Sequence, residues 1–380
     1  MPINFLLTSY FSPLQKPITL SQQFGFQIDN PRGDKEIAYT KGLLTDLYEV
    51  GTGLIPLYSN DYIVTLDSII SSYQEIFSNS DGYIKEFFRE YTREKTFDYL
   101  AKMWCVARYD DEGLIDEYNE IIQHSNESGQ TTVITMEGQN PILQNSQKLV
   151  NYCHLLSLLS HNEEEDYFGR VFIYDDLSLP GYKIPDRISK DLLMNHFLNK
   201  FGSEQRQSGD WAAWQHGSKE IQKNAALLEK AFNNGHAEKL LYIGNLLEIV
   251  NRTYDERVRL LILTSIIELL VTRNPDTSRF NVEDSINKQF QLKASILIYQ
   301  NDKERDINDI KERLKEIYKQ RSNIAHGNFN EKKKEKAKGK KKAVVTGDYE
   351  KLVSDLYVFN RAIIEEYLKD TKFVEFIKNG

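Results

Sequence analysis

Cysteine is almost missing from this chain of 380 residues, in which Cys105 and Cys153 are the only two. They form no CxxC pair and have no histidine cluster nearby, so the sequence predicts neither a disulfide framework nor a structural zinc site. No apolar run reaches the length of a membrane span, and the first residues lack the positively charged segment of a signal peptide. We therefore expect a cytoplasmic protein with no membrane partner.

Signatures of the common enzyme classes are missing as well. The sequence has no Gly-x-Ser-x-Gly elbow, no Walker-type phosphate loop and no dinucleotide-binding fingerprint. Its histidines include no HxxxH or HExxH pair, so we expect no metal site and no cofactor. Residues 1–235 therefore contain no recognisable set of catalytic residues.

Charge is divided unevenly along the chain. The whole sequence has 48 Lys and Arg against 56 Asp and Glu, a net charge of −8. Residues 251–380 nevertheless carry 27 basic and 21 acidic side chains, which leaves the first 250 residues with a net charge of −14. Eight lysines and two glutamates between positions 331 and 342 account for the basic excess. A polyanionic partner would therefore meet the C-terminal region.

Residues 1–235 combine two patterns. Alternating apolar and polar residues predict strands at Ile18–Ile28, Leu54–Leu66, Gln130–Met136 and Arg170–Tyr174. Apolar residues at helical spacing predict helices at Ser68–Phe77, Tyr83–Ala107, Asn145–Leu159, Ile188–Phe201 and Ser218–Phe232. We therefore expect a mixed, mostly helical α+β domain over residues 1–235.

Residues 236–380 are almost entirely helical by the same criterion. The predicted helices are Ala237–Arg252, Asp255–Thr272, Val282–Tyr299, Asp302–Ala325 and Asp348–Leu368. Val258–Val271 in the second helix is apolar almost all round, so this helix belongs in the centre of a bundle. Glu268 is the one ionisable interruption in the apolar core of that run, and its carboxylate needs a partner or water. The fourth has its apolar stripe at Ile307, Ile310, Leu314 and Ile317. The fold class is therefore mainly α, an α+β domain followed by an all-α helical bundle.

An arginine and a histidine stand five residues apart at the end of the fourth helix. The stretch runs Lys319-Gln-Arg-Ser-Asn-Ile-Ala-His-Gly327, and the glycine is suited to close the helix. Five residues of an ideal helix turn about 500°, so Arg321 and His326 would lie about 140° apart. They converge only if the helix ends between them or if two copies of the chain meet across a two-fold axis.

Residues 240–370 resemble a HEPN domain, in particular the ApeA-like branch of that family. The resemblance rests on Ser265-Ile-Ile-Glu268-Leu-Leu, on Glu283-Asp-Ser-Ile-Asn-Lys and above all on the stretch from Tyr318 to Gly327. It covers about a third of the chain and says nothing about residues 1–235. It implies a metal-independent endoribonuclease in which the Arg-x4–6-His motifs of two domains face one another across a homodimer interface.

The resemblance implies a role for each residue of the motif. Arg321 would hold the scissile phosphate and stabilise the charge of the transition state. His326 would act as acid and base, or would position the attacking 2′-hydroxyl. Asn323 would orient either of them, but Ser322 stands where many family members have an amide or an acid, so the supporting role is open between these two. Glu268 would pair with Arg321 and fix its rotamer.

The lysine-rich segment would add affinity for RNA phosphates without reading base sequence. Its members are Lys332, Lys333, Lys334, Lys336, Lys338, Lys340, Lys341 and Lys342. A solvated insertion would have the same composition, and the two interpretations are compatible.

Three hypotheses follow. The first is a ribonuclease that cuts RNA, with tRNA among the candidate substrates, as a toxin in bacterial abortive-infection defence, triggered by a phage-derived or operon-encoded activator. The second is a non-catalytic HEPN module that binds RNA, dimerises, or partners a nucleotidyltransferase antitoxin. The third, a hydrolase with its site in residues 1–235, is the least favoured because no catalytic constellation supports it.

Overall fold

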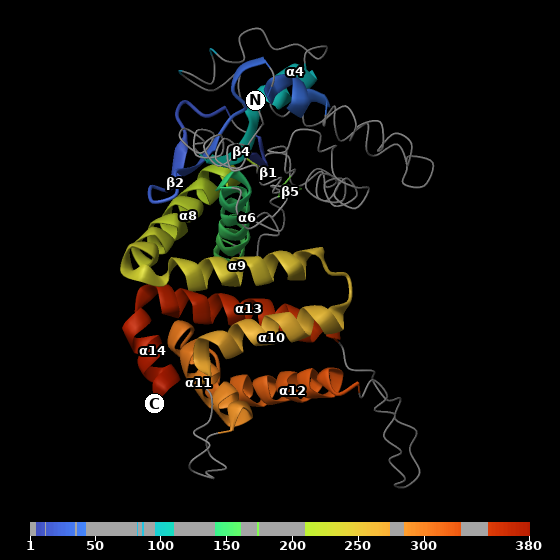
Figure 1. Ribbon diagram of the computed structural model, residues 1–380, viewed down its shortest axis with the longest axis vertical. Helices are drawn as coiled ribbons and strands as arrows, with labels where there is room; N and C mark the ends of the chain where they lie inside the picture. The colour runs from blue at the N-terminus through green and yellow to red at the C-terminus, as the bar shows by residue number, and fades with distance from the viewer. Residues whose placement is uncertain are drawn as a thin grey trace, which may run out of the picture. The chain divides into compact units, whose positions relative to one another are not determined.

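The computed structural model describes residues 5–11, 13–34, 36–42, 82, 86, 96–109, 141–160, 173–174, 210–273, 285–327 and 349–380. The chain divides into two compact units, Met1–Asn233 and Asn234–Gly380. The division lies two residues before the boundary that the sequence suggests after residue 235. The chain is mainly helical, as predicted, and in its described part all strands belong to the first unit (Figure 1).

The first unit contains a sheet with the strand order β2-β3-β4-β1-β5, in which every neighbouring pair is antiparallel. The strands are β1 (Phe5–Phe11), β2 (Ile18–Ser21), β3 (Phe26–Asp29), β4 (Trp104–Tyr109) and β5 (Ile173–Tyr174). All six residues of β4 are buried. β4 therefore lies in the core of this unit, where it pairs with β3 on one side and with β1 on the other.

The single helix predicted for Tyr83–Ala107 is wrong at its C-terminal end. The structure has α4 (Thr96–Met103), and β4 begins at the next residue, Trp104. Trp104 continues the apolar spacing of the helix, and neither Gly nor Pro marks the change, so the local pattern carries no signal for it. Pairing with β3 and β1 makes this segment a strand, because the tertiary context overrides local preference.

Two further helices pack in this unit. α6 (Pro141–Leu159) contacts β4, and α8 (Asp210–Ala231) contacts β2 and α6. Both are predicted from the sequence, although each begins earlier than expected. The elements predicted at 54–66, 68–77, 130–136 and 188–201 lie outside the described residues.

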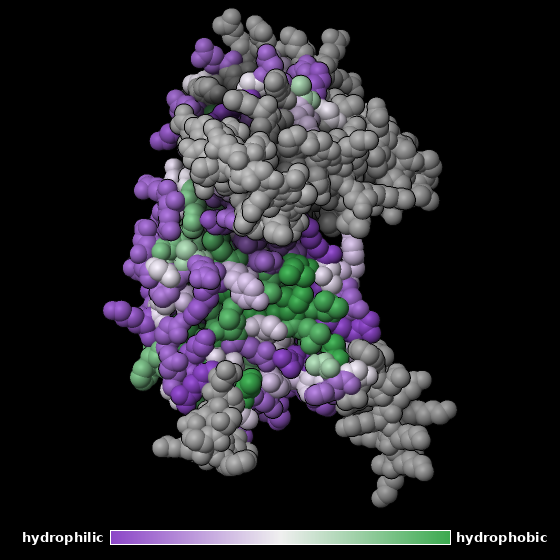
Figure 2. Space-filling view, in the orientation of Figure 1, coloured by the Kyte–Doolittle hydropathy of each residue, from purple (hydrophilic) through white to green (hydrophobic). Residues whose placement is uncertain are grey.

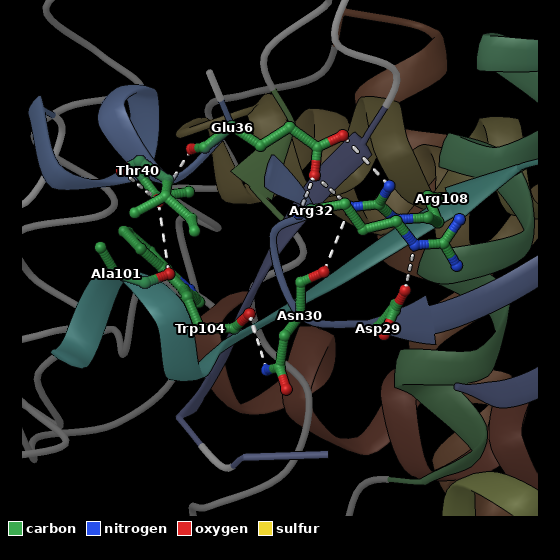
Figure 3. Close-up of polar contacts among 9 residues, drawn as sticks. Asp29, Asn30, Arg32, Glu36, Thr40, Ala101, Trp104 and Arg108 are labelled. Carbon is green, nitrogen blue, oxygen red and sulfur yellow. Dashed lines mark hydrogen bonds and ion pairs between the residues drawn. The ribbon is translucent and has the colours of Figure 1, made fainter. Parts of the chain in front are cut away.

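A buried arginine ties the segment after β3 to the sheet (Figure 3). Arg108 of β4 donates Nη1 to Glu36 Oε1 at 3.1 Å and Nη2 to the Asn30 carbonyl at 3.3 Å. Four residues beyond Glu36, the buried Thr40 hydroxyl lies 3.3 Å from the Ala101 carbonyl. Because a buried charge is costly unless it is paired, we assign this network a structural role.

The second unit is a helical bundle with six helices among its described residues. They are α9 (Ala237–Arg252), α10 (Glu256–Val271), α11 (Ile286–Asn301), α12 (Ile307–Ala325), α13 (Tyr349–Lys369) and α14 (Thr371–Asn379). α10 contacts the other five. It is the central helix of the bundle, as its apolar sequence predicts, and its buried side chains are Leu260, Leu263, Thr264, Ile266, Ile267, Leu270 and Val271.

Capping side chains explain where several of these helices begin. The side chains of Asp255, Ser285, Asp306 and Asp370 accept hydrogen bonds from the first turns of α10, α11, α12 and α14.

Three predictions about this unit need correction. α12 begins at Ile307 rather than at Asp302, because Asp306 caps it while Asp302 closes α11. Ile307 is consequently exposed in the first turn, and the buried stripe consists of Ile310, Leu314 and Ile317. The third helix begins at Ile286, since Ser285 is its N-cap. α14 was not predicted, although Asp370 followed by apolar residues at helical spacing signals it.

Part of the apolar surface of the second unit is exposed. Figure 2 shows apolar side chains gathered over α9 and α10. The exposed large apolar side chains of these two helices are Tyr242, Ile249 and Val258. No helix in the described ranges is long and apolar enough to span a bilayer.

Candidate functional site

α12 ends inside the Arg–His motif. Its last residue is Ala325, His326 is the C-cap, and Gly327 has a φ of +68°, the left-handed conformation that glycine adopts without strain. The His326 N–H donates to the Ser322 carbonyl at 3.1 Å, and the Gly327 N–H donates to the Ile324 carbonyl at 3.0 Å. The helix therefore closes at Gly327, as the sequence predicts.

Arg321 of α12 contacts Glu268 of the central helix α10. Its Nη2 lies 3.2 Å from Glu268 Oε2, and the two side chains are 31% and 16% exposed, respectively. The ion pair expected between these residues is thus present. Only one nitrogen and one oxygen take part, because Arg321 Nε and Glu268 Oε1 are buried without a hydrogen-bond partner. Part of the donor capacity of the guanidinium therefore stays unused.

An aromatic side chain is a second neighbour of Arg321. The ring centroid of Tyr318, one turn earlier on α12, lies 5.7 Å from the guanidinium carbon of Arg321, within the range of cation–π attraction. The same ring packs on the buried Phe290 of α11, with centroids 5.2 Å apart. Burial raises the pKa of Tyr318, the charge of Glu268 and hydrogen bonding between the two side chains raise it further, and the charge of Arg321 acts in the opposite direction.

Three helices thus contribute to the environment of Arg321, α11 through its contact with Tyr318. α10 supplies the carboxylate, α11 supports the aromatic ring, and α12 carries the arginine itself. Sequence analysis missed Tyr318 and Phe290 as parts of this site. The spacing of three residues between Tyr318 and Arg321, which places side chains on one face of a helix, is the signal that could have found the first of them.

His326 is exposed at the helix end, and Ser322 and Asn323 are half-buried between it and Arg321. α12 thus ends between Arg321 and His326, and the C-cap residue His326 has a φ of −94° and a ψ of 7°. On an ideal helix, two side chains five residues apart would start about 140° apart.

The other predicted site residues are not placed by the structure. The eight lysines between 332 and 342 lie outside the described residues. Within the described part of the chain, no group of three or more His, Cys, Asp and Glu side chains could hold a metal ion.

Comparisons of the chain with models of known protein families, with curated proteins and with solved structures found no match. The resemblance of residues 240–370 to HEPN domains therefore rests on the motif residues.

Proposed function

We propose that the second unit is a metal-independent endoribonuclease of the HEPN type. The observation that carries the proposal is the environment of Arg321. Its guanidinium contacts both Glu268 and Tyr318 near the end of α12, five residues before an exposed His326. A guanidinium fork suits the oxygens of a phosphodiester, and an imidazole can move protons near neutral pH.

The substrate supplies its own nucleophile in this reaction. The 2′-oxygen of RNA forms a bond to the adjacent phosphorus while the bond from phosphorus to the 5′-oxygen breaks. A neutral His326 accepts the proton of the 2′-hydroxyl, and a protonated His326 gives a proton to the leaving 5′-oxygen. Arg321 binds the non-bridging oxygens, on which negative charge grows in the transition state. The products are a 2′,3′-cyclic phosphate and a free 5′-hydroxyl.

A homodimer is the active form in this proposal. On an ideal helix the side chains at positions 321 and 326 would start about 140° apart, and a two-fold axis that pairs α12 with its copy would bring the arginine of one to the histidine of the other. The exposed apolar side chains of Ile249 on α9 and Val258 on α10 would supply further area for a second copy to bury.

The biological setting follows from the resemblance alone. We place the activity in the cytoplasm, in defence against phage, with an activator encoded by the phage or by a neighbouring gene. The acidic first unit would sense, restrain or dock, and the lysine-rich segment would hold the RNA backbone.

Cleavage of RNA in EDTA tests the proposal. The substrates are total tRNA and a labelled single strand, and the proteins are the wild type, Arg321→Ala and His326→Ala. We expect cyclic-phosphate ends from the wild type and a loss of at least about 10²-fold in each variant.

Arg305→Ala is the matched control, because Arg305 also pairs with a carboxylate, that of Asp302 at 2.9 Å, and is 37% exposed. It should retain wild-type activity. Equal cleavage by His326→Ala and the wild type would remove His326 from the chemistry. A wild type that binds RNA but never cuts it would support the non-catalytic HEPN module instead.

A further inference from the structure

We propose that Tyr318 is a positioning residue of this site, whose ring holds the Arg321 guanidinium in the orientation in which it receives a phosphate. The inference rests on the proposed function, and it adds a residue that the Arg–His motif does not contain.

The ion pair with Glu268 cannot orient Arg321 by itself. A bidentate pair between a guanidinium and a carboxylate fixes the plane of the guanidinium, because two parallel hydrogen bonds define it. Here the single close contact joins Arg321 Nη2 to Glu268 Oε2, while Arg321 Nε and Glu268 Oε1 have no hydrogen-bond partner. A single contact leaves the guanidinium free to turn about the Nη2–Oε2 line. A second contact away from that line is needed to stop the rotation.

The ring of Tyr318 supplies that second contact. It lies 5.7 Å from the guanidinium carbon, and its attraction acts on the charged plane as a whole rather than on one nitrogen. The ring itself cannot move freely, because it packs on Phe290, which is fully buried on α11. The buried Phe290 therefore restrains the ring of Tyr318, and the ring in turn restrains the guanidinium of Arg321.

The ring of Tyr318 contacts Arg321, whereas its hydroxyl interacts with Glu268. Phenylalanine presents the same kind of π-face to a cation, so Tyr318→Phe keeps the contact with Arg321. Tyr318→Leu keeps an apolar side chain on Phe290 but removes the π-face. The comparison of these two variants isolates the contact on which the proposal depends.

Cleavage kinetics provide the first test. We expect Tyr318→Leu to lower kcat about tenfold, since a misplaced catalytic group costs mainly rate, and to change KM by less than about threefold. Tyr318→Phe should stay within about threefold of the wild type in both constants. Tyr299→Leu is the matched control, because it removes another half-buried tyrosine of the bundle whose ring lies 4.5 Å from a cation, Lys303 Nζ. It should leave both constants unchanged.

A spectroscopic test does not depend on cleavage. The ring current of Tyr318 shifts the Nε–Hε resonance of Arg321, which can be assigned by its loss in Arg321→Lys. We expect Tyr318→Leu to move this resonance and Tyr318→Phe to leave it close to the wild-type position. Thermal unfolding of each variant shows whether the bundle stays folded.

The outcomes are distinct. If Tyr318→Phe is as impaired as Tyr318→Leu, the hydroxyl acts and the proposal is wrong. If Tyr318→Leu is as active as the wild type, or if the Arg321 resonance does not move, the ring does not position the guanidinium. If the wild type cuts no RNA, the proposed function fails, and the Arg321 resonance alone then decides whether the ring holds the guanidinium.

Discussion

The ion pair between Arg321 and Glu268 should give a measurable coupling energy. The perturbation is a double-mutant cycle with Arg321→Ala, Glu268→Ala and both together. Fully exposed pairs are worth about 0–1 kcal/mol, whereas breaking a buried pair costs about 3–5 kcal/mol. With side chains 31% and 16% exposed and one contact of 3.2 Å, this pair lies between the two cases but nearer the first. We expect a coupling energy of about 1 kcal/mol.

Urea unfolding followed by the helical circular dichroism signal measures this coupling. The chain has two compact units, so the unfolding curve can contain two transitions. The transition whose midpoint shifts in the single variants is that of the second unit, because Arg321 and Glu268 both lie in it. The control is the cycle between Glu312 and Lys315 on α12, 3.1 Å apart and 70% and 58% exposed, for which we expect less than about 0.5 kcal/mol. A coupling no larger than that of the control would refute the conclusion that Glu268 holds Arg321 in the folded state.

Three other predictions follow from the structure and the sequence. Gly327→Ala should destabilise the protein by about 1–2 kcal/mol, since an L side chain is strained at a φ of +68°. An unchanged thermal unfolding curve would contradict the left-handed conformation of residue 327. Burial acts to raise the pKa of Glu375, but the hydrogen bond and charge of Lys239, 2.6 Å away, hold that pKa below its usual value. A lowered pKa stabilises the fold above the unfolded-state pKa, and this stabilisation is lost as pH falls through the folded-state pKa. Glu375→Gln should therefore flatten the acid side of a plot of Tm against pH, and an unaltered acid side would count against the contact. Replacing Lys340–Lys342 by glutamine should make the plot of log affinity for single-stranded RNA against log salt concentration less steep by about 2. Fluorescence anisotropy at several salt concentrations measures this slope. A slope equal to that of the wild type would show that these lysines do not contact RNA.

Local signals in the sequence were sufficient for most of the helical bundle. α9 has the predicted bounds, Ala237–Arg252, and α10 fills the predicted interval between its caps Asp255 and Thr272. The apolar run Val258–Val271, with Glu268 as the one ionisable interruption in its core, also predicted the central place of α10. These features depend on side chains within a few residues of one another, as capping and helical periodicity do, so they can be read along the chain.

Features that depend on distant segments could not be predicted in this way. Trp104 continues a helical pattern but begins β4, because pairing with β1 and β3 decides its conformation.

The candidate site likewise has features that the sequence determines and features that depend on tertiary structure. The sequence by itself determined the spacing of Arg321 and His326, the helix end at Gly327 and the presence of one carboxylate, Glu268, in an apolar helix. Only the tertiary structure decided that Glu268 lies against Arg321, 53 positions away in the chain, and that the ring of Tyr318 borders the guanidinium. The physical reason is that these contacts join α10, α11 and α12, and their geometry depends on how the three helices pack rather than on the residues of any one of them.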